Sequence, residues 1–311
     1  MPNKKKQGKL ILICILGGSA VLLTSVLFYR NKYWKGIENT LYVSELKMVD
    51  ANYTEGKLNR YFNQNAGSET VVSIPFESFE INKNGTKIIG IVIEHQNDFY
   101  GIVEYDMENK RRTDILNYAD LQENIRKYGI SNNNDEILHV KFGNMKGEYT
   151  FLYAGKLWEL SGGAVKPIAD VPGRCYEWLD EETIIIEKDG DMITYNIHTG
   201  ETERMFEDCR LNSEFMLSNN REFVVYEGVN KHGLYKYSLK TGTKQYLTGL
   251  EGSADIAISD NDKYIAYFDS YYTISHSGIT KLYVMDLENG KKKTLDRYSE
   301  SIAGGPARGI K

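Results

Sequence analysis

Proline and cysteine are both scarce in this chain of 311 residues, with five prolines and three cysteines. Three cysteines cannot build the framework of several disulfides that supports small secreted scaffolds. Few prolines, together with 23 tyrosines, favour regular strands over a disordered chain. Cys175 and Cys209 open two consecutive repeats, which are described below. Whether these two cysteines form a disulfide stays open at this point, because sequence does not reveal the geometry of the pair.

Acidic residues are absent from the first 30 positions, which hold five of the 38 basic residues. The remainder therefore carries 33 basic and 43 acidic residues, a net charge of −10. A domain of that charge is repelled by phosphate backbones, so we expect no nucleic-acid partner.

Motifs for catalysis, cofactor binding and metal binding are missing as well. The chain contains no GxSxG, GxxxxGK or GxGxxG sequence and no HxxxH or CxxC spacing. We therefore expect no catalytic residues, no cofactor and no metal site. His95, His232 and His276 fall in presumed hairpins on one face of the fold inferred below. A shared metal or substrate site is one interpretation of them, and three separate, solvated loop histidines is the one we favour.

Acidic clusters at 180–182 and 260–262 coincide with turns that precede apolar strands. Asp and Asn cap the backbone at such positions, whereas a calcium loop requires more oxygen ligands at fixed spacing. We interpret both clusters as turns.

One long apolar run covers Leu10–Tyr29, twenty residues without a charge. About 20 apolar residues span the hydrocarbon core of a bilayer, and a cleaved signal peptide, the alternative, has a shorter apolar region. Four lysines precede the run and three basic residues follow it, so the charge bias favours a cytoplasmic N-terminus. We predict a cytoplasmic tail (1–9), a transmembrane helix (10–29), a juxtamembrane linker (30–37) and an extracytoplasmic domain (38–311).

That outer domain repeats a two-part pattern. An apolar strand after a polar turn occurs at 81–92, 178–187, 217–227 and 258–270. A strand–turn–strand unit follows at 100–116, 155–169, 192–206, 233–247 and 281–295. The turns contain Asn-Gly, Thr-Gly or Gly-Gly, which tolerate the positive φ of tight hairpins. They recur every 37 to 54 residues, the period of four-stranded propeller blades.

The amino-acid sequence of the repeats resembles that of TolB-like and WD-repeat-like β-propellers of bacterial envelope proteins. Their blade has a SPDGKYIAF-type turn and strand followed by an LYVVDLDGGKPRRLT-type hairpin. The best matches are ISDNDKYIAYF (258–268) and LYVMDLENGKKKTL (282–295), within a resemblance over about 75–311. The proline of the first motif is absent throughout, and the second repeat (139–169) is poorly formed. The resemblance implies an all-β propeller and no particular chemistry.

Both ends of the chain carry fragments of a further repeat. Leu41-Tyr42-Val43 and the segment 56–62 resemble the hairpin half, and 304–311 resembles the start of another blade. We predict about six four-stranded blades, five of them clear and the sixth shared by the two termini, with a five-bladed or incomplete ring as the alternative. Between the first two blades, Leu121, Ile125 and Tyr128 are spaced for one helical face, and Asn117 is suited to cap that helix.

Three tryptophans and one loop complete the candidate residues. We expect Trp34 at the membrane interface and Trp158 and Trp178 in the core. The loop 268–278 is rich in tyrosine and serves either as a contact surface or as a packed hairpin.

The predicted role is a non-enzymatic binding or scaffold module for an envelope protein or cell-surface polymer. The alternative is a glycoside hydrolase or lyase with its site in the central funnel, which predicts acidic or histidine side chains converging there.

Overall fold

A computed structural model describes the protein over residues 41–50, 53–61, 68–82, 84–94, 99–130, 138–142, 148–173, 175–211, 214–272, 278–298 and 306–310. The predicted transmembrane segment, the linker and Trp34 lie outside these residues. Within the described part, no helix has both the length and the apolar character needed to cross a membrane.

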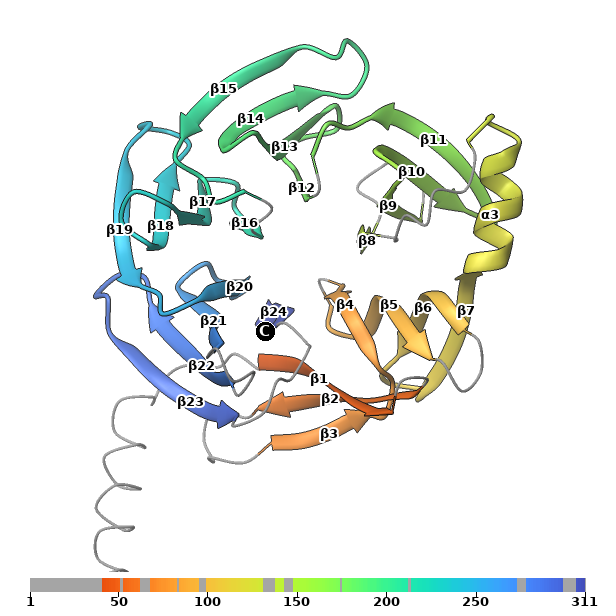
Figure 1. Cartoon of the computed structure of the whole chain (residues 1–311), viewed down its shortest axis with the longest axis horizontal. Helices are drawn as coiled ribbons and strands as arrows, with labels where there is room; N and C mark the ends of the chain where they lie inside the picture. The colour runs from red at the N-terminus through yellow and green to blue at the C-terminus, as the bar shows by residue number, and fades with distance from the viewer. Residues whose placement is uncertain are drawn as a thin grey trace, which may run out of the picture.

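Five four-stranded antiparallel blades surround a common axis (Figure 1). In every blade the first strand in sequence (A) is innermost and the fourth (D) is outermost. Blade 1 consists of β4 (Phe76–Ile81), β5 (Lys87–Glu94), β6 (Phe99–Asp106) and β7 (Arg111–Asn117), and blade 2 of β8 (Leu138–Phe142), β9 (Tyr149–Tyr153), β10 (Lys156–Ser161) and β11 (Ala164–Asp170). Blade 3 consists of β12 (Tyr176–Trp178), β13 (Thr183–Lys188), β14 (Asp191–Asn196) and β15 (Thr202–Glu207), and blade 4 of β16 (Phe215–Leu217), β17 (Phe223–Gly228), β18 (Gly233–Ser238) and β19 (Lys244–Gly249). Blade 5 consists of β20 (Ser253–Ile258), β21 (Tyr264–Tyr272), β22 (Gly278–Asp286) and β23 (Lys292–Tyr298).

Four further strands come from the two ends of the chain: β1 (Leu41–Asp50), β2 (Tyr53–Tyr61), β3 (Ser68–Val72) and β24 (Pro306–Ile310). They pair in the order β3-β2-β1-β24, and a parallel bridge between Arg308 and Glu80 joins β24 to β4. Strands β1 and β24, far apart in the sequence, therefore pair with each other between blades 5 and 1 (Figure 1).

The alternating strands give the ring two faces. The A–B and C–D turns lie on one face, which we call the entry face because β1 begins there: Leu41 pairs with Ile310, the last residue of β24. The B–C turns and the connections between blades lie on the opposite, connection face.

Polar residues close the turns as the sequence pattern predicts. Asp180 Oδ1 accepts hydrogen bonds from the backbone N–H groups of Glu182 (2.9 Å) and Thr183 (2.8 Å). Asp106 and Asp286 cap their C–D turns in the same way. In the second cluster, Asp262 instead accepts from the backbone of Asn219 and so joins the turns of blades 4 and 5. Both acidic clusters therefore serve turns and blade contacts.

A register shift occurs between strands C and D of every blade, with one extra residue on strand D. Such a bulge bends the strand and increases its twist, as a propeller blade requires. In blade 4 the extra residue is Leu247 on β19, and Gly233 of the facing strand β18 lies beside this bulge. A Cβ at Gly233 would lie 2.2 Å from the carbonyl oxygen of Thr248.

The core consists of apolar clusters between neighbouring blades. Trp158 and Trp178 lie in these clusters with 0% and 6% exposure, so the prediction that both are core residues is confirmed. Cys175 and Cys209 share the cluster between blades 3 and 4, and they do not form a disulfide. The question that the sequence left open is thereby answered.

Helix α3 (Tyr118–Arg126) confirms the predicted helix. Asn117 caps it by accepting a hydrogen bond from Asp120 N, and Leu121 and Ile125 are fully buried against blades 1 and 2. The helix lies along the outer rim beside β7 and β11, because its apolar side fills the gap between those blades (Figure 1).

Candidate functional site

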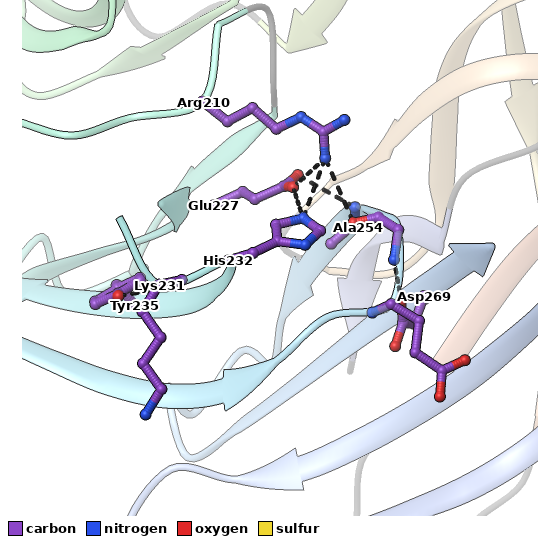
Figure 2. A network of polar contacts seen from close by, with 9 residues as sticks. Arg210, Glu227, Lys231, His232, Tyr235, Ala254 and Asp269 are labelled. Carbon is purple, nitrogen blue, oxygen red and sulfur yellow. Dashed lines mark hydrogen bonds and ion pairs between the residues drawn. The ribbon is translucent and has the colours of Figure 1, made fainter. Parts of the chain in front are cut away.

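A buried carboxylate on the connection face is the centre of the candidate site (Figure 2). Glu227 lies near the end of β17, a strand whose six residues are all buried, and its own exposure is 0%. The connection from blade 3 to blade 4 pairs with the end of β17. Cys209 forms a β-bridge with Gly228, and Arg210 N donates a hydrogen bond to Glu227 O at 2.9 Å. This pairing places the Arg210 side chain beside the carboxylate.

Two cationic or polar side chains and one backbone group surround Glu227. Its Oε1 accepts from Arg210 Nη1 and from His232 Nε2 at 2.9 Å, and its Oε2 accepts from Ala254 N at 3.3 Å. Arg210 Nη1 also lies 3.4 Å from Gly252 O. We call Arg210, Glu227 and His232 the Glu227 cluster. Because a buried charge is costly unless it is paired, the cluster fixes these three residues together.

His232 Nε2 has two neighbours, since Arg210 Nη1 is 3.3 Å away. If His232 Nε2 carries a hydrogen and donates it to Glu227, then His232 Nε2 and Arg210 Nη1 are both donors, and no hydrogen bond forms between these two nitrogens. The shorter contact with the buried carboxylate determines the orientation of the ring.

A second buried carboxylate fixes the neighbouring connection. Asp269, 4% exposed, accepts from the backbone N–H groups of Glu251 (2.9 Å) and Gly252 (3.0 Å). The carbonyl oxygen of Gly252 in turn lies 3.4 Å from Arg210 Nη1. The described residues of the connections from blade 3 to 4 and from blade 4 to 5 therefore form one rigid surface around the Glu227 cluster.

Charged residues also lie on the innermost strands, and they link blades to one another. Lys141 on β8 pairs with Glu177 on β12 at 2.5 Å, with side chains only 4% and 11% exposed. His139 Nδ1 lies 3.9 Å from Glu214 Oε1, which joins blade 2 to the start of blade 4. Glu80 accepts from Phe142 N at 2.6 Å across blades 1 and 2. Each of these carboxylates thus has a partner in another blade.

Of the three histidines singled out in the sequence, His95 and His276 lie outside the described residues. His232 lies on the connection face as predicted, but it contacts a buried carboxylate and is not simply a solvated loop residue. The described part of the chain contains no group of three metal-ligating side chains. In the tyrosine-rich loop, residues 273–277 lie outside the described part.

Sequence reasoning missed Arg210 and Glu227. The available signal was the end of the apolar run in LSNNREFVVYE (217–227), where a glutamate occupies a position that continues a buried strand. Arg210, 17 residues earlier, belongs to a connection with no repeat pattern of its own.

The ring of four-stranded sheets with innermost first strands defines the protein as a β-propeller. Solved structures with the same fold include TolB from Acinetobacter baumannii, at 14% identity and a TM-score of 0.56 over 88% of this chain and 65% of that one. A chain of a nidogen/laminin complex matches at 11% identity and 0.56, over 87% and 97% of the two chains. A putative TolB from Agrobacterium tumefaciens matches at 11% and 0.51, over 86% and 91%.

At these identities the similarity establishes the fold alone. The chain spans 65% of the length of the Acinetobacter TolB chain. No protein-family model and no curated protein matches the sequence.

Proposed function

We propose that this protein is a membrane-tethered propeller that holds an envelope protein on its connection face, outside the cytoplasm, without acting on it chemically. The proposal retains the cytoplasmic tail (1–9), the membrane span Leu10–Tyr29, the linker (30–37) and the outer domain (38–311).

Exposed apolar side chains beside the Glu227 cluster are the observation that carries the proposal. Leu211 directly follows Arg210 and is 61% exposed, and Val229, in the turn that leads to His232, is 57% exposed. Arg210 and His232 are themselves about two-fifths exposed, at 43% and 42%. Arginine is enriched in protein interfaces, and the fully buried core of an interface is more apolar than the rest of the protein surface. A rigid surface also loses little conformational entropy when a partner binds.

The direction of β1 supports the choice of this face. Since β1 begins with Leu41 on the entry face, an anchor that precedes it attaches to that face. The connection face, with Leu211 and Val229, is then directed away from the membrane and toward proteins of the envelope.

The proposal includes a six-bladed ring in which β24, β1, β2 and β3 act as strands A to D of the last blade. The pairing order β3-β2-β1-β24 and the parallel alignment of β24 with β4 support this assignment. In a closed ring the last blade packs against both of its neighbours, and only the short edges of the outermost strands remain exposed.

The alternative, an enzyme acting on polysaccharide from the central funnel, requires carboxylates positioned to act on a substrate. In the described residues, Glu80, Glu177 and Glu214 instead contact groups of other blades. These contacts favour a structural role for the three carboxylates and therefore favour the binding function.

Site-specific photo-crosslinking in intact cells tests the proposal. The full-length chain would carry a photo-reactive amino acid at position 211 or 229, with position 240, an exposed residue of a C–D turn on the entry face, as the control. We expect positions 211 and 229 to yield the same crosslinked envelope protein and position 240 not to yield it. Introducing Val229→Asp should remove the adduct formed at position 211. Equal yields from all three positions, or no adduct from 211 and 229, would contradict the proposal.

A further inference from the structure

A hollow of about 240 Å³ lies on the sheet surface of blade 4, away from the Glu227 cluster. Its lining comes from β17, β18, β19 and the turns beside them, and consists of Glu222, Phe223, Lys236, Ser238, Thr241, Thr243 and Gln245. The volume is below the ~300–1,000 Å³ of sites for drug-sized ligands, so it suits one small ring.

Strand register explains why these side chains meet. Lys236 and Ser238 are two residues apart on β18 and therefore point to the same side of the sheet. Ser238 is opposite Phe223 on β17, and Lys236 is opposite Gln245 on β19. Phe223 also belongs to the cluster between blades 4 and 5, so the hollow lies on the side of blade 4 that faces blade 5.

The lining combines one cation, one anion, three hydroxyls and one amide. Lys236 Nζ lies 4.1 Å from the centre of the Phe223 ring, and no ion pair joins it to any residue in the described part of the chain. Glu222 Oε2 accepts from Asn220 Nδ2 at 2.9 Å. The hollow therefore offers both donors and acceptors, with no net charge.

This balance selects among small ligands. A phosphate or free carboxylate would meet the Glu222 carboxylate, and an amine would meet the Lys236 ammonium. A sugar hydroxyl both donates and accepts hydrogen bonds, and so matches hydroxyl, amide, ammonium and carboxylate groups alike. We propose that the hollow binds one neutral pyranose ring of a carbohydrate. This site is separate from the connection face and does not depend on the function proposed for that face.

Titration of the full-length chain in lipid nanodiscs tests the assignment, because glycoside detergents would compete for the site. The probes are methyl glucoside and methyl N-acetylglucosaminide, with inorganic phosphate as the comparator, followed by saturation-transfer NMR. We expect saturable binding of at least one glycoside and none of phosphate. K236M keeps the stem that covers Phe223 but removes the donor, and should weaken binding about tenfold or more. K240M changes an exposed lysine of the same hairpin that does not line the hollow, and should leave the affinity unchanged.

Gln245 provides a second test variant, Q245A, since this side chain is exposed and its removal disturbs no core contact. If K236M does not fold, weaker glycoside binding by Q245A alone supports the site. Absence of saturable binding by both glycosides would overturn the proposal, as would saturable phosphate binding or unchanged affinity in folded K236M or in Q245A. Crosslinking from positions 211 and 229 is expected to be the same in all these variants, so the two proposals fail separately.

Discussion

Replacing Arg210 by methionine should destabilise the protein more than replacing its partner Glu227 by glutamine. R210M leaves a carboxylate with 0% exposure whose remaining contacts are His232 Nε2 and Ala254 N. Removing one partner of a buried ion pair lowers the free energy of unfolding by about 3–5 kcal/mol. Because the carboxylate keeps two contacts in R210M, we expect a loss near the lower value, about 3 kcal/mol. E227Q removes the buried charge itself, and Arg210, 43% exposed, keeps its access to water and its contact with Gly252 O. Its cost is about 1–2 kcal/mol, the value of the lost hydrogen bonds.

The double variant R210M/E227Q distinguishes this explanation from a simple loss of contacts. Because it contains no unpaired buried charge, it should be more stable than R210M alone by about 1–2 kcal/mol. Urea unfolding followed by tryptophan fluorescence measures the difference, since Trp158 and Trp178 are buried reporters. The control is R204M, whose arginine is 54% exposed and pairs with surface carboxylates, with an expected loss below about 1 kcal/mol. A double variant that is less stable than R210M would refute the reasoning.

Three further predictions follow from the fold. Gly233→Ala should destabilise blade 4 by more than about 1 kcal/mol, measured by urea unfolding, because its Cβ would lie 2.2 Å from Thr248 O; unchanged stability would argue against the bulge geometry. Leu121→Ala should cost about 2–5 kcal/mol in the same assay, since this helix residue is fully buried against two blades, whereas Glu123→Ala on the exposed side should cost little. Burial raises the pKa of the Cys209 thiol to about 12 from 9.0. The unfolded thiol ionises first, so its contribution to stability is present below pH 9 and is lost between pH 9 and 12. Native protein at pH 8 should accordingly resist thiol reagents at this position, and rapid modification there would show that the thiol is accessible.

Much of the ring could be predicted from sequence because its strands and turns are specified locally. Asp106, Asp180 and Asp286 cap their turns within a few residues, and the alternating strands follow directly. Blade 2 was hard to recognise because β9 reads Tyr-Thr-Phe-Leu-Tyr and is buried on both sides, so it shows no polar alternation. Its turn from β8 also lies outside the described residues.

The candidate site could not be predicted, because its partners are brought together by contacts between blades. Arg210 approaches Glu227 only through the bridge between a connection and the end of β17, and Ala254 N comes from the next blade. Helix α3 shows the same limit. Its existence follows from local spacing and the Asn117 cap, but its position on the outer rim depends on where two blades leave apolar surface uncovered.

The central claim is that the connection face of a tethered propeller is directed to the outside of the cell. A cysteine placed at the exposed Val229 of the full-length chain tests it most directly, using a maleimide that cannot cross membranes. The background should be low, because Cys175 and Cys209 are buried and Cys14 lies in the predicted span. The account predicts labelling of V229C in intact cells, equal to that after lysis, with no labelling of the wild-type chain. Labelling of V229C only after lysis would contradict it.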